Sequence, residues 1–126
     1  MAITFERIVP LLQISEREKA WEFYIDFLGF TLDWERSIEP GLPLSAQVSR
    51  GNLVLRLIED PSNSSSGVRV RVETTGVEEL QRELASRKYA HMNPSLERAP
   101  WGELVVGVID PFGNRIYFCE PIPTDA

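Results

Sequence analysis

The spacing of hydrophobic residues predicts two helices, one in each half of the chain. A stripe that recurs every three or four residues lies between Ser15 and Gly29, which is the spacing of one helical face. Its members are Ala20, Phe23, Tyr24, Phe27 and Leu28. A shorter stripe follows Thr75 and consists of Val77, Leu80 and Leu84. Glycine is typical of the position just after a helix, so we expect the first helix to end at Gly29.

The two predicted helices share a start signal. Ser15 and Glu18 form the S-x-x-E pattern of a capping box, and Thr75 and Glu78 form the T-x-x-E version of it. In such a box each of the two side chains bonds a backbone N–H group at the start of the helix. We therefore predict side-chain caps at Ser15 and Thr75.

β-rich runs on either side of a Gly-Asn pair predict two hairpins. One run pair spans 44–59 and turns at "GN", and the other spans 103–120 and turns at "DPFGN". The segments "ERIVPLLQI" and "GVRVRVE" predict one further strand ahead of each helix. Each half of the chain thus reads as strand, helix and then three strands.

This repeat predicts an α+β fold rather than a doubly wound parallel sheet. We expect a single domain, 1–126, built from two βαβββ modules at about 1–60 and 67–126. The eight strands are expected to form a curved mixed sheet. The polar, turn-rich segment "DPSNSSS" at 60–66 is the predicted linker between the modules.

Strict alternation in the strand "VRVRVE" separates two kinds of surface. Its valines point one way, while Arg69, Arg71 and Glu73 point the other way. With one helix per module, one face of each sheet is covered and the other is free. If the valines meet the helices, the arginines line the free concave face, where a ligand would bind.

Composition and charge restrict the classes of partner. The chain has 126 residues, with 13 Lys and Arg against 19 Asp and Glu, so its net charge is −6. This balance argues against nucleic acid and anionic membranes as partners. No apolar stretch approaches the length of a membrane span, and the N-terminus lacks the apolar core of a signal peptide. Cys119 is the only cysteine, so we predict a buried thiol in a cytoplasmic protein.

The chain resembles the vicinal oxygen chelate superfamily, which includes glyoxalase I, extradiol dioxygenases, fosfomycin resistance proteins and bleomycin resistance proteins. The segments "VPLLQISEREKAWEFYIDFLGF" and "PWGELVVGVIDPFGNRIYF" are similar to the opening and closing motifs of that family. Pro10, the short length and the pair Trp101-Gly102 look most like the bleomycin resistance proteins. The resemblance implies the glyoxalase/bleomycin resistance protein fold. It also implies a homodimer that pairs modules across subunits, with the N-terminal strand exchanged near Pro10.

Enzymes of this superfamily hold a divalent metal with a His or Glu from the first and last strand of each module. Counting from the motifs, these positions here are Val9, Arg56, Gly67 and Tyr117. None offers an imidazole, thiolate or carboxylate ligand, so we predict no metal and no cofactor. His91 is the only histidine, and we interpret it as a solvated loop residue in preference to a general base.

The resemblance places Trp101 where bleomycin resistance proteins stack a tryptophan on the drug, and Trp34 where they have a second aromatic wall. We read Trp21 as a packing or dimer-contact residue. The predicted ligand-binding residues are Trp34, Trp101, Arg56, Arg69, Arg71 and Tyr117. The arginines either pair with carboxylates such as Glu73 and Glu103, which admits a cationic bleomycin-like drug, or stay free, which favours an aromatic anion.

The resulting functional hypothesis is a non-catalytic binding protein that sequesters an aromatic drug or metabolite in a cleft at a dimer interface. The alternative is an enzyme of the superfamily, of the lyase, isomerase or dioxygenase type, with an atypical or metal-free site. A ligand-sensing domain is a third reading. The fold alone does not separate these classes, because it hosts many functions.

Overall fold

The computed structural model describes residues 2–37, 44–60, 67–87 and 89–123. Along the chain the elements are β1 (Leu11–Ile14), α1 (Arg17–Trp21), the π-helix η1 (Glu22–Phe27), β2 (Thr31–Arg36), β3 (Ser45–Arg50), β4 (Leu53–Glu59), β5 (Arg69–Glu73), α2 (Val77–Ser86), β6 (Glu97–Ala99), β7 (Glu103–Ile109) and β8 (Arg115–Pro121). The predicted order of strand, helix and three strands is therefore present twice. The predicted linker falls almost entirely outside the described residues.

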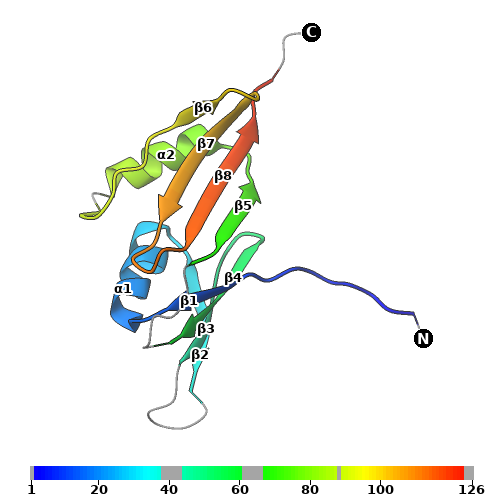
Figure 1. The fold of residues 1–126 in the computed structure, drawn as a ribbon, viewed down its shortest axis with the longest axis vertical. Helices are drawn as coiled ribbons and strands as arrows, with labels where there is room; N and C mark the ends of the chain where they lie inside the picture. The colour runs from blue at the N-terminus through cyan, green and yellow to red at the C-terminus, as the bar shows by residue number, and fades with distance from the viewer. Residues whose placement is uncertain (1, 38–43, 61–66, 88, 124–126) are drawn as a thin grey trace.

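The strands are hydrogen-bonded as two four-stranded mixed sheets, one from each half of the chain. Their orders are β1-β4-β3-β2 and β5-β8-β7-β6, so the first strand of each module pairs with the last. That pairing is parallel in both sheets, and the remaining pairings are antiparallel. Figure 1 shows the two sheets one above the other, with α2 against the upper one. The predicted α+β class and βαβββ repeat are confirmed.

The first helical segment supplies much of the core. The whole predicted stripe is buried, from Ala20 to Leu28. After α1 the chain continues into η1, where the N–H of Leu28 donates to Phe23 O at 2.9 Å, a five-residue step. Gly29 follows with φ +77°, the left-handed conformation expected of a helix end. Trp21 packs against the same core. No described helix is long and apolar enough to cross a membrane.

The predicted caps at Ser15 and Thr75 are wrong. Helix α1 starts after Glu16, and α2 starts after Gly76, whose φ is +94°, and neither residue makes a side-chain cap. The N-terminus of α2 is instead capped from the neighbouring sheet. Glu120 on β8 accepts the N–H groups of Gly76 and Val77 at 3.2 and 3.0 Å. A carboxylate brought in by tertiary structure thus takes the place of the local threonine.

The turn between β7 and β8 joins the two modules. Asp110 and Asn114 are both buried there. The Tyr24 hydroxyl donates to Asp110 at 2.6 Å, and Asn114 Nδ2 donates to the Gln13 carbonyl at 2.8 Å. Both partners belong to the first module. The "DPFGN" motif therefore does more than make a tight turn, because its polar side chains bind the modules together.

A second connection closes the C-terminal end of η1. Arg50 donates to the Leu28 carbonyl at 2.9 Å, and Arg87 donates to the Phe27 carbonyl at 2.7 Å. Both guanidinium groups pair with Glu83 on α2, at 2.6 and 3.0 Å. The cations lie where the helix carbonyls are unpaired, which is the end of a helix that attracts positive charge.

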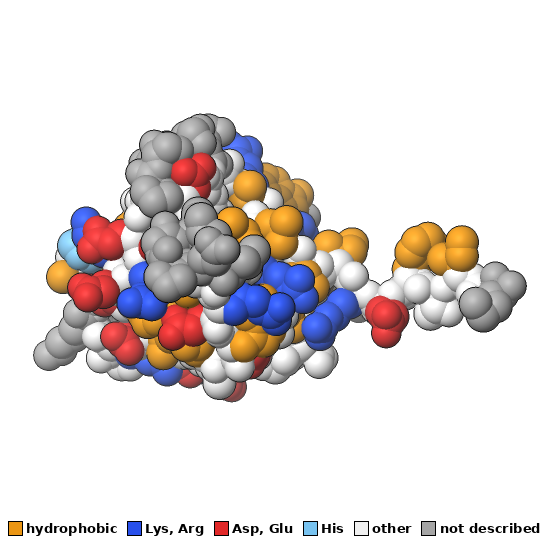
Figure 2. Space-filling model, turned by 90° about the horizontal axis from the view of Figure 1, so that it is seen from below, with side chains coloured by type: hydrophobic (Ala, Val, Ile, Leu, Met, Phe, Trp, Pro, Cys, Tyr) orange, Lys and Arg blue, Asp and Glu red, His pale blue; other side chains and the backbone are white. Residues whose placement is uncertain are grey.

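Residues 2–10, which we call the arm, precede β1 and belong to no helix or strand. The arm extends away from both sheets (Figure 1) and stands clear of the body with hydrophobic side chains along it (Figure 2). Ile3, Phe5 and Ile8 are 82%, 94% and 92% exposed. Such side chains are normally covered by protein.

Candidate functional site

Each sheet has one face on the core and one free face. In the second sheet Val70 and Val72 of β5 pack against the core, as do Ile116 and Phe118 of β8. The alternating residues between them lie on the opposite face. We call the free face of this sheet the second free face, and that of the sheet β1-β4-β3-β2 the first free face. The second free face carries Arg69, Arg71, Glu73, Arg115, Tyr117 and Cys119, together with Glu103 and Gly107 of β7. The predicted separation of valines from arginines is confirmed.

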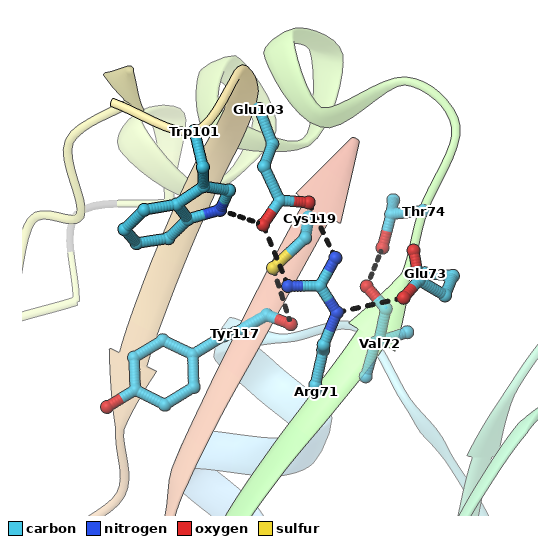
Figure 3. Close-up of polar contacts among 8 residues, drawn as sticks. All are labelled: Arg71, Val72, Glu73, Thr74, Trp101, Glu103, Tyr117 and Cys119. Carbon is cyan, nitrogen blue, oxygen red and sulfur yellow. Dashed lines mark hydrogen bonds and ion pairs between the residues drawn. The ribbon is translucent and has the colours of Figure 1, made fainter. Parts of the chain in front are cut away.

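Four of these side chains and Trp101 form the Arg71 cluster, which consists of Arg71, Glu73, Trp101, Glu103 and Cys119 (Figure 3). Arg71 binds Glu103 with both terminal nitrogens, at 2.8 and 2.5 Å, and donates from Nε to Glu73 at 2.8 Å. The indole N–H of Trp101 donates to the same Glu103 carboxylate. Trp101 and Arg71, predicted as site residues from separate motifs, are therefore joined through Glu103.

Hydrogen bonds from Arg71 hold the pKa of Glu103 down at about 2, with a further contribution from the Trp101 N–H. The same contacts, first with Glu103 and then with Glu73, raise the pKa of Arg71. Burial raises the pKa of the Cys119 thiol, which keeps it protonated and unreactive at neutral pH. The cluster holds one cation and two carboxylates, so this end of the face is net negative.

The other end of the second free face is positive. Arg69 and Arg115 are register neighbours in the parallel pair β5–β8, and both side chains are exposed. Neither makes an ion pair or a side-chain hydrogen bond with the described residues. We call these two residues the basic pair. The two predicted arginines of β5 therefore differ in their pairing, because Arg71 is neutralised by carboxylates and Arg69 is not.

Tyr117 lies between these two ends and owes its position to Gly107. The two residues are partners in the β7–β8 ladder. A Cβ atom on Gly107 would lie 3.3 Å from Tyr117 Cδ1, so the ring lies close against the bare backbone of β7. Tyr117 is half-buried, with Arg115 two residues before it on the same face of β8. Nothing in the sequence pattern marks Gly107, since only the strand pairing brings it under the ring.

The first free face carries Trp34 and Arg56. A bulge in β2 between Leu32 and Trp34 interrupts the pairing with β3. The half-buried Trp34 ring has the guanidinium carbons of Arg36 and Arg56 at 4.1 and 5.4 Å from its centroid, both within cation–π range. Arg56 Nε also donates to Gln47 at 3.3 Å.

Trp34 and Trp101 lie on different sheets of this chain, in β2 and just before β7. A groove of about 870 Å³ runs along β5 between the modules, but neither tryptophan lines it. Of the predicted site residues only Arg71 does. Its lining combines apolar residues with charged ones; the apolar residues include Leu28, Phe30, Val70, Val72 and Leu80, and the charged ones include Arg50, Glu79 and Glu83. Within one subunit the predicted residues therefore form two separate surfaces.

Two of the four counted metal positions lie in strands and two do not. Across the parallel pairs, Arg56 faces Leu11 and Tyr117 faces Arg71, whereas Val9 and Gly67 lie before their strands. Neither Leu11 nor Arg71 is a metal ligand. Among the described residues no three His, Cys, Asp or Glu side chains come together as a metal site.

Similar proteins in sequence and structure include bleomycin resistance proteins. Those of Geobacillus stearothermophilus and Staphylococcus aureus are 29% identical over 132 aligned positions, which cover 90% of this chain and 96% of theirs. A bleomycin-binding protein from bleomycin-producing Streptomyces verticillus, solved with copper(II)-bleomycin, superposes with a TM-score of 0.71 at 24% identity, covering 98% of this chain and 100% of that one.

A glyoxalase family protein from Enterococcus faecalis also superposes with a TM-score of 0.71, at 15% identity and over 92% of this chain and 98% of its own. At these identities the structural likenesses establish the fold. The family itself is established by sequence, because the model described as "Glyoxalase superfamily protein" matches residues 1–125, nearly the whole chain. The protein with these two free sheet faces belongs to the glyoxalase superfamily.

Proposed function

We propose that this protein is a non-catalytic binding protein that sequesters an aromatic drug or metabolite. The observation that carries the proposal is Trp101, a residue that is 73% exposed while its indole N–H donates to the buried Glu103. An indole fixed in this way presents an ordered apolar surface to solvent, ready for stacking. The similarity to bleomycin resistance proteins supports the same function.

The charge around Trp101 is compatible with a cationic ligand. Arg71 is paired with Glu73 and Glu103, so it does not repel a cation that approaches Trp101. The bleomycin-binding protein of Streptomyces verticillus was solved with copper(II)-bleomycin, and a ligand of that kind fits this net negative end of the face. Binding of this type requires no bound metal and no cofactor of the protein's own. We place the activity in the cytoplasm, where the single Cys119 stays reduced.

The working unit in this proposal is a homodimer. Ile3 and Phe5 of the arm are almost fully exposed, and the groove along β5 has apolar side chains among its lining, with Ile8 and Pro10 at the base of the subunit's own arm on its edge. We propose that each arm docks on the partner subunit in this groove. Trp34 of one subunit and Trp101 of its partner then line one cleft, which the separate surfaces of a single chain do not form.

The test is calorimetric titration of the wild-type protein, Trp101→Ala and Trp34→Ala with two probes, bleomycin and the neutral aromatic 2-naphthalenemethanol. Each stacked ring contributes ~0.5–1.5 kcal/mol, so each substitution should weaken binding roughly two- to tenfold. Trp21→Phe is the control, because Trp21 packs on the core and should not change affinity. Unchanged affinity in both alanine variants, with circular dichroism showing that they are folded, would refute the proposal. So would the absence of binding by the wild type.

A further inference from the structure

The basic pair marks a second kind of recognition on the free face that carries Trp101. Arg69 and Arg115 lie side by side on β5 and β8, and both guanidinium groups are on the solvent side of the sheet. Like charges placed directly beside each other across two strands destabilise a sheet. A shared anion removes that repulsion, and a guanidinium pair binds carboxylate, sulfonate or phosphate oxygens in defined geometry.

The chain has enough carboxylates to neutralise this pair, but those nearby are engaged elsewhere. Asp110, five residues before Arg115, is buried, and each of its carboxylate oxygens already accepts two hydrogen bonds. Its Oδ1 accepts the N–H groups of Phe112 and Asn114 at 2.9 and 2.8 Å. Its Oδ2 accepts the Tyr24 hydroxyl and the Asn114 amide at 2.6 and 2.8 Å.

Glu73 and Glu103, the other acids on this face, are held by Arg71. In a chain of net charge −6, this leaves two adjacent arginines without an acidic partner among the described residues.

Apolar side chains flank the basic pair on the β8 and β7 side. Tyr117 follows Arg115 on the same face of β8 and lies close over Gly107. Ile109, the β7 partner of Arg115, is 43% exposed. An aromatic ring that rests on Tyr117 and Ile109 would carry an acidic substituent toward Arg115 and Arg69.

We propose that Arg69 and Arg115 form an anion subsite that binds the acidic group of an aromatic carboxylate or sulfonate whose ring contacts Tyr117. The inference rests on the proposed aromatic-binding function and adds a charge requirement to it. The free face then has two unlike ends, one anionic at Glu103 beside Trp101 and one cationic at the basic pair. The ligand class that suits both ends is an aromatic molecule with an acidic group, extended by a cationic or neutral part toward Trp101.

The test compares naphthalene-2-sulfonate with the neutral 2-naphthalenemethanol by calorimetry in low-salt buffer. The wild type should bind the sulfonate about tenfold more tightly, because each of the two exposed guanidinium groups adds a charge contact that the neutral probe lacks. The double variant R69Q/R115Q should lose this preference and keep its affinity for the neutral probe. Tyr117→Leu should weaken the binding of both probes. Raising the salt concentration should reduce only the sulfonate affinity.

Arg82→Gln is the matched control, because Arg82 is exposed on α2, a helix that packs on the core face of this sheet and not on its free face. It should leave both affinities unchanged. If both probes bind the wild type equally, or if R69Q/R115Q keeps the preference, the anion subsite is refuted while aromatic binding stands. If neither probe nor bleomycin binds the wild type, the proposed function fails and the subsite fails with it.

Discussion

Among the individual side chains, the arginines show how the same residue type is used in three ways. Arg50 and Arg87 bond helix carbonyls, Arg71 is neutralised by two carboxylates, and Arg69 and Arg115 face solvent together. Alternation along β5 was enough to predict that Arg69 and Arg71 share a face. It could not predict that only Arg71 is paired, because Glu103 reaches it from β7, across β8.

The pKa of Glu103 provides a test at this scale. Because Arg71 and Trp101 hold the pKa at about 2, the ionised form and its bonds are fully present above the usual glutamate pKa near 4.3. They are lost only as the pH falls through about 2. At pH 3.5, below the usual glutamate pKa, the carboxyl carbon of Glu103 should therefore still give the NMR shift of a carboxylate. In Arg71→Gln the pKa of Glu103 should rise towards the usual value. A wild-type Glu103 that titrates near the usual glutamate pKa of about 4.3 would show that the cluster is not formed in solution.

Among the helices and strands, the repeat of elements was predictable and the way the elements are fixed was not. The helices were predicted from the sequence alone because the helical spacing of apolar residues in 20–28 and 77–84 is a local property of the chain. The capping boxes failed because a cap can be supplied from far away, as Glu120 does for α2 from β8. The hairpins were predicted from the Gly-Asn turns, but the bonds from Asn114 to the other module depend on packing that no local pattern encodes.

The contact between α2 and the end of η1 depends on Glu83, which gives a prediction at this scale. Glu83→Gln removes the charge that Arg50 and Arg87 share, and we expect the free energy of unfolding to fall by about 1 kcal/mol. The three side chains are about one-third exposed, which limits the effect. Urea denaturation measures it. Glu78→Gln on the same helix is the control, since Glu78 makes no ion pair within the described part of the chain. A larger loss in the control than in Glu83→Gln would contradict the assignment.

For the whole molecule, the sequence predicted a set of site residues but not where the fold places them. Trp34 and Trp101 came from the two halves of the chain, and in one subunit they lie on separate sheets. Residues 6–10 of the arm, predicted as part of a longer first strand, lie outside β1, and the apolar side chains of the arm are uncovered. In the homodimer that we propose, a second subunit covers the arm and brings the two tryptophans together.

Replacing Ile3, Phe5 and Ile8 by serine should therefore yield a monomer. Light scattering at micromolar concentration should give the chain mass of 14.3 kDa for this variant and twice that mass for the wild type. The monomeric variant should also bind aromatic probes more weakly than the wild type, because the cleft takes one tryptophan from each subunit. Thr4→Ala with Glu6→Ala changes polar residues of the same arm and should stay dimeric. A wild-type monomer, or a serine variant that remains a dimer, would rule out this role of the arm.

The turn from Asp110 to Asn114 has a consequence for folding. Its buried side chains take the Tyr24 hydroxyl and the Gln13 carbonyl as partners, so the second module is left with unpaired buried groups whenever the first module opens. The first hairpin turns at the exposed Gly51 and Asn52 and makes no such demand. The two hairpin turns are thus unequal in their contacts. Neither module has all its buried polar groups paired until both modules have assembled. The chain is expected to lose its structure in one cooperative step rather than module by module.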